Sequence, residues 1–142
     1  MTQDVDMLDF ICKNAEMGRD NLLHVIKQVN EPKFRSALEN QQHGYETVYD
    51  KANEMLHQMG ERPEPSSAMA KTMAHVSTVM QTIVDDSPSN IAEMVLQGSS
   101  MGIAKMTKRL HQYDGENQRI VKLAEKLIRM EQANIEEMKK YL

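Results

Sequence analysis

The chain has 142 residues, of which 40% are hydrophobic and 27% are charged, and this length and composition predict a single globular domain over residues 1–142. The net charge of -4 supplies no basic surface for nucleic acid, and no run of residues suits a membrane span or a signal peptide. Cys12 is the only cysteine, which excludes an internal disulfide and a thiolate metal cluster and predicts a cytoplasmic protein.

Hydrophobic residues recur at helical spacing in five segments, and no segment alternates like a β-strand. The first segment covers about residues 4–29, and Pro32 suits the first turn of the second, which ends at Gly60. A proline-containing linker follows, and Ser66 or Ser67 is the predicted N-cap of a third helix that ends near residue 84. The all-α fold class is therefore the first prediction of the sequence.

Two further helices complete the chain. Ser87 is the predicted N-cap and Pro88 the first residue of the fourth helix, which ends before the turn at Asp114 and Gly115. The fifth helix is expected over about residues 117–142. Short breaks make helices one and two, and helices four and five, antiparallel neighbours. Two such hairpins joined by one long crossover form the ferritin-like arrangement of a four-helix bundle, here with an additional crossover helix.

Methionine is unusually frequent, with 13 residues, whereas tryptophan is absent and aromatic residues make up 4%. Copper ligation by thioethers and a promiscuous binding groove are two functions open to a methionine-rich chain. Most of these side chains fall at apolar helical positions, and no methionine pair accompanies a histidine in a way that favours copper. We therefore expect methionine to fill gaps in a helical core, and Cys12 to be buried there as a small apolar side chain.

A short internal repeat links the first and fourth helices. The tetrad Ala-Glu-Met-Gly at residues 15–18 resembles Ser-Ser-Met-Gly at residues 99–102, and each precedes its hairpin turn by a similar distance. Glycine inside a helix costs roughly 1 kcal/mol relative to alanine. Two matched glycines therefore predict close helix contacts at one level of the bundle.

Several short motifs together resemble a bacterial ferritin-like domain family of unknown function. They are residues 11–19, the proline-rich turn at 59–63, the helix that begins at Ser66 and the glycine-containing element of the fourth helix. The resemblance implies a ferritin-like bundle with an extra crossover helix and no settled activity. The family's Glu before the glycine is matched by Glu16, whereas the fourth helix carries Ser100 in that place.

Glu131 and Asn134 lie one turn apart on the predicted buried face of the last helix. Di-iron and di-manganese bundles place a Glu-x-x-His pair there, with carboxylates from the other helices. Asn134 replaces the histidine, and only Glu16 and Glu46 offer further carboxylates near that level. Glu16, Glu46 and Glu131 are the candidate metal ligands, and iron or manganese is the metal that they would hold.

A metal-free interpretation uses the same buried face. Arg19 and Tyr45 fall at a similar level on facing helices, and an Arg–carboxylate pair with a phenol hydrogen bond would satisfy Glu131 without a metal. The predicted buried polar cluster is therefore Arg19, Tyr45, Glu131 and Asn134. In this hypothesis, the Arg19 guanidinium replaces the cation of an ancestral metal site.

Three functions remain open from the sequence, and no serine, histidine or glycine-rich motif predicts a catalytic site. The leading prediction is a structural or interaction module that has lost its di-metal site, needs no cofactor and forms a homo-oligomer, with a dimer favoured. Met7, Met94 and Met101 are the side chains expected at its interface. The first alternative is a di-iron or manganese oxidoreductase or iron-handling protein, and the second is a spore-coat-like structural protein.

Overall fold

The computed structural model describes residues 2–61 and 85–142, and these residues form four α-helices without a β-strand. The helices are α1 (Thr2–Ile26), α2 (Pro32–Gln58), α4 (Pro88–Gln112) and α5 (Gln118–Lys139). The all-α prediction is confirmed for this part of the chain. The helix predicted between Ser66 and residue 84 lies outside the described residues.

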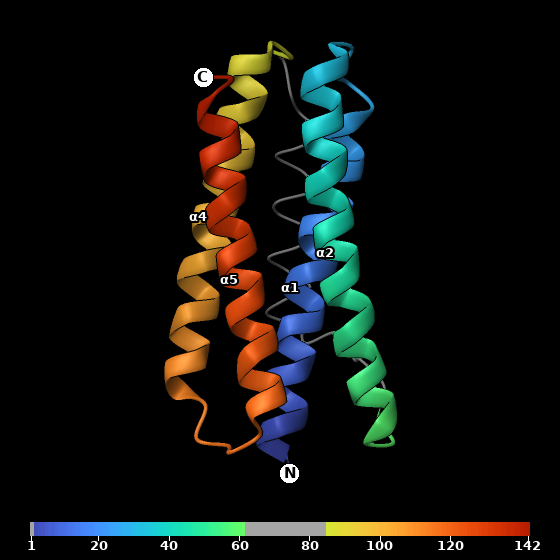
Figure 1. The fold of residues 1–142 in the computed structure, drawn as a ribbon, viewed down its shortest axis with the longest axis vertical. Coiled ribbons are helices and arrows are strands. Elements are labelled where there is room, and N and C mark those ends of the chain that lie inside the picture. The colour runs from blue at the N-terminus through green and yellow to red at the C-terminus, as the bar shows by residue number, and fades with distance from the viewer. Residues whose placement is uncertain (1, 62–84) are drawn as a thin grey trace.

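The helices pack as two antiparallel hairpins, α1 with α2 and α4 with α5, and the hairpins join through contacts of α1 with α4 and of α2 with α5 (Figure 1). The α2 helix ends at the lower end of the bundle in Figure 1, and α4 begins at the upper end. The last turn of α2 and the first turn of α4 therefore lie at opposite ends of the bundle. The predicted four-helix bundle of two hairpins is confirmed.

Local sequence signals place three of the helix starts. The Ser87 hydroxyl accepts a hydrogen bond from the Asn90 backbone N–H at 3.3 Å, as an N-cap does. Glu31 caps α2 by accepting from the backbone of Lys33 and Phe34, and Asn117 caps α5. The helix ends are less well predicted, since α1 stops at Ile26 and α5 at Lys139, each three residues earlier than expected.

The core is built from aliphatic side chains and methionine. Met7, Met55, Met106 and Met138 are all at most 3% exposed, which supports the interpretation that methionine fills gaps between helices. Met7 was expected at an interface, and that prediction is wrong because its side chain is packed inside the bundle. Cys12 is also buried, and burial raises the pKa of its thiol to about 12.

No helix in residues 2–61 and 85–142 has the length and apolar character that a membrane crossing requires.

Candidate functional site

A hydrogen bond between the two hairpins lies at the centre of the bundle. The Tyr45 hydroxyl on α2 donates to the Glu131 carboxyl Oε2 on α5 at 2.9 Å. Tyr45 is 4% exposed and Glu131 is 2% exposed. A direct hydrogen bond therefore joins two of the four residues expected in the buried polar cluster.

Two glycines make room for this pair. A Cβ at Gly18 of α1 would lie 2.6 Å from the Tyr45 ring, and a Cβ at Gly102 of α4 would overlap the Glu131 carboxyl. These are the glycines of the repeated tetrads, so the repeat has a steric explanation. Each hairpin carries one large polar side chain and, on its other helix, the glycine that accommodates it.

The Glu131 carboxyl has no charged partner in the part of the chain that the structure describes. Burial raises the pKa of Glu131 from its ordinary value of 4.5 to about 8, and the hydrogen bond from Tyr45 opposes part of this rise. Burial, and then the nearby Glu131 carboxyl, raise the pKa of the Tyr45 phenol. At neutral pH the pair is therefore predominantly a carboxylic acid beside a phenol, with little net charge inside the bundle.

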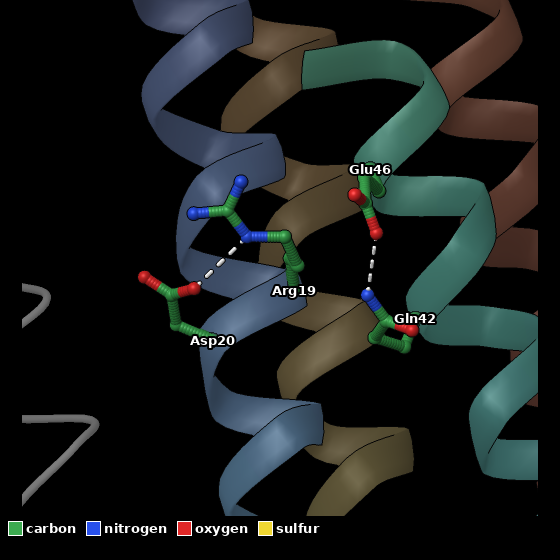
Figure 2. A network of polar contacts seen from close by, with 4 residues as sticks. All are labelled: Arg19, Asp20, Gln42 and Glu46. Atoms are coloured by element: carbon green, nitrogen blue, oxygen red, sulfur yellow. Dashed lines mark hydrogen bonds and ion pairs between the residues drawn. The ribbon is translucent and has the colours of Figure 1, made fainter. Parts of the chain in front are cut away.

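Arg19 does not join this pair, so the prediction that it compensates Glu131 is wrong. Its Nε donates to the Asp20 carboxylate at 2.9 Å, and its Cζ lies 4.6 Å from the centre of the Tyr49 ring. Figure 2 shows this guanidinium beside Asp20. The Arg19 side chain keeps 23% of its surface exposed, so it contacts an anion and an aromatic face at a smaller desolvation cost than full burial beside Glu131 would require.

Asn134 and Ser99 surround the central hydrogen bond. Both are buried, at 7% and 3% exposed, and both act as hydrogen-bonding neighbours that lower the pKa of Tyr45 against the effect of burial. Asn134 was expected here from its spacing to Glu131. Ser99 was not expected in the cluster. The Ser-Ser-Met-Gly tetrad, which begins with Ser99, is the sequence feature that could have indicated it.

The remaining metal-ligand candidates are not gathered with Glu131. Glu46 accepts a hydrogen bond from the Gln42 side chain at 2.9 Å on its own helix (Figure 2), and Glu16 is half-buried on α1. Within residues 2–61 and 85–142, three or more His, Cys, Asp or Glu side chains nowhere group in a way that could hold a metal ion. The donor set at this level therefore does not fit a di-metal centre, which needs several carboxylates and imidazoles.

A cavity of about 270 Å³ lies between α1 and α4 and includes Tyr45 and Glu131 in its wall. Its apolar wall is formed mainly by Met17, Leu22, Met94 and Val95. Ligand pockets in proteins combine such an apolar lining with a few polar groups. The arrangement can therefore bind a small molecule next to a buried carboxyl.

Comparisons of the chain with protein-family models, with curated proteins and with solved structures each give no match.

Proposed function

We propose that the protein is a non-enzymatic, ferritin-like helical bundle that acts as a structural or interaction module in the cytoplasm. The observation that carries the proposal is the Tyr45–Glu131 hydrogen bond of 2.9 Å. It occupies the interior level at which a di-metal bundle would hold its ligands. The phenol donates to one oxygen of the carboxyl there, and burial keeps that carboxyl mostly protonated at neutral pH, so the pair carries little charge for a bound cation to compensate.

The ferritin-like assignment is supported by the direction of the helices. The α2 and α4 helices run the same way, so the end of α2 and the start of α4 lie at opposite ends of the bundle (Figure 1). Bundles with one long crossover have this topology, whereas simple up-down-up-down bundles do not.

Metal content tests the proposal directly. We expect untagged protein, purified without chelator from cells grown with added iron, manganese and zinc, to contain far less than one metal ion per chain. The measurement is elemental analysis by mass spectrometry. Glu131→Gln is the matched variant, because it keeps the side-chain shape and removes the ionisable ligand. Iron or manganese near one or two ions per chain, lost in that variant, would establish the alternative metal-binding function and overturn this one.

We also propose that the module is a homodimer, with α1 and α4 contributing apolar side chains to the contact. Leu23 on α1 is 43% exposed and Met101 on α4 is 44% exposed. Exposed large apolar side chains are enriched where proteins associate. We expect light scattering after size exclusion to give the mass of two chains, and Met101→Glu to shift the mass toward one chain. A monomer at all accessible concentrations would contradict the proposal.

A further inference from the structure

The wall of the cavity between α1 and α4 contains one carboxyl group, that of Glu131. Among the described residues that line it, Glu131 is the only one whose side chain can ionise near neutral pH, and lysine, arginine and histidine do not contribute. An anionic ligand would therefore meet a carboxyl and no cation. The carboxyl of Glu131 therefore disfavours an anionic ligand and leaves a neutral molecule or a cation.

Two polar atoms of the cavity wall are unsatisfied. Glu131 Oε1 and Asn14 Nδ2 have no hydrogen-bond partner among the described residues, although Glu131 is 2% exposed and Asn14 is 3% exposed. Buried polar atoms without partners are uncommon, and each costs about 1–3 kcal/mol in a folded protein. Both belong to residues that line the same cavity, so a ligand held there could relieve this cost.

Part of the wall is apolar and adaptable, although Asn21, Gln97 and Ser99 also line it. Met17 and Met94 lie there with Leu22 and Val95, and methionine side chains adjust to irregular shapes more easily than branched ones. A short alkyl chain suits this lining. The volume of about 270 Å³ accommodates a small molecule but not a folded partner segment.

We propose that this cavity binds a small primary alkylammonium ion, whose charged group donates to Glu131 while its alkyl chain packs against Met17 and Met94. An ammonium group offers three donors and a full positive charge, and therefore matches the free Oε1 of ionised Glu131 better than a neutral donor does. The competing ligand is a neutral alcohol, which could also accept from Asn14. Binding of a metabolite in this way goes beyond the structural role proposed above.

Three ligands of nearly equal shape separate these possibilities. They are 3-methylbutan-1-amine, 3-methylbutan-1-ol and 3-methylbutanoate, which present a cation, a neutral hydroxyl and an anion on the same alkyl chain. At about pH 8.5 the amine remains largely charged, and Glu131, with its pKa of about 8, is mostly ionised. We expect the amine to bind roughly ten- to a hundredfold more tightly than the alcohol, since hydrogen bonds to charged groups contribute about 1.5–3 kcal/mol. The carboxylate should not bind measurably.

NMR of methyl-labelled methionine locates the site during the same titrations. We expect the methyl signals of Met17, Met94 and Met101, which line the cavity, to shift with the amine. Those of Met55 and Met138, which are buried and are not among the lining residues, should stay in place. Glu131→Gln should weaken amine binding at least tenfold and change alcohol binding much less. Glu125→Gln is the matched control, because Glu125 is exposed on the same helix.

Two outcomes would overturn the inference. Equal affinity for the amine and the alcohol would show that the carboxyl does not select a cation. Unshifted signals of the three lining methionines, up to tens of millimolar amine, would show that the cavity is not a binding site. If Glu131→Gln fails to fold, the ligand series and the methionine shifts of the unmodified protein still decide both points.

Discussion

Gly102→Ala should destabilise the protein by about 2–4 kcal/mol, although alanine is the better helix former by roughly 1 kcal/mol. The added Cβ would overlap the Glu131 carboxyl, and the carboxyl must move to avoid it. Overpacking of a core typically costs about 1–3 kcal/mol, and the loss of a buried hydrogen bond costs a similar amount. The measurement is the free energy of unfolding from urea denaturation at pH 7.

Gly98 provides the matched control one turn earlier on the same helix. A Cβ at Gly98 has no other atom within 4 Å, and the residue is exposed. Gly98→Ala should therefore stabilise the protein by up to about 1 kcal/mol through helix propensity alone. If the two variants had the same free energy of unfolding, Gly102 would not be required for the position of Glu131.

A second large effect is expected in the dependence of stability on pH. The pKa of Glu131 is raised from 4.5 to about 8 by burial, so the folded state holds a proton that the unfolded state releases between these values. The associated stability is fully present below about pH 4.5 and is lost as the pH rises through about 8. The loss is on the order of 5 kcal/mol, because the pKa rises by about 3.5 units and each unit corresponds to about 1.4 kcal/mol.

Glu131→Gln should remove this component, since glutamine has a similar shape and no ionisable proton in this range. We expect the variant to be more stable than the wild-type protein at about pH 8.5 and to lose this advantage near pH 5. Other groups with shifted pKa values titrate outside the pH range from 4.5 to about 8 in which Glu131 acts. Asp85, whose pKa is lowered by Ser87, titrates below it, and Cys12, at about 12, titrates above it.

Urea denaturation at half-unit steps between pH 5 and 8.5 would measure both stability curves. Glu125→Gln, an exposed substitution on α5, controls for the change in net charge. Parallel curves for the wild-type protein and Glu131→Gln would contradict the assignment of a raised pKa to Glu131.

The sequence predicts much of the fold because the signals that delimit the helices are local. Ser87 and Pro88 begin α4 through a side-chain hydrogen bond and a fixed backbone angle within one turn. The helix ends are predicted less well. Val29 keeps its apolar contact and remains 4% exposed, although α1 has already ended at Ile26, so its burial does not require a helical backbone.

The candidate site is predicted only in part, and the physical reasons differ between residues. The Tyr45 ring is rigid and the Glu131 side chain is shorter than that of an arginine, so helix face and level predict their approach. Arg19 has a long side chain that turns to Asp20 and Tyr49, and its position on the helix does not determine where its charge lies. The cavity depends on the spacing between α1 and α4, which no residue pattern in the sequence encodes.

The central hydrogen bond also constrains how the two hairpins can be assembled. Each hairpin contains its own large polar side chain and the glycine that accommodates it, so the space for Tyr45 and the space for Glu131 can form before the hairpins meet. The hydrogen bond between Tyr45 and Glu131 forms at only one alignment of the two hairpins along the bundle axis. A slip of one helical turn, about 5.4 Å, would separate the phenol from the carboxyl and leave two desolvated polar groups without partners. Methionine-rich surfaces tolerate many packings, so the polar pair selects a single docking register that the apolar core alone would define weakly.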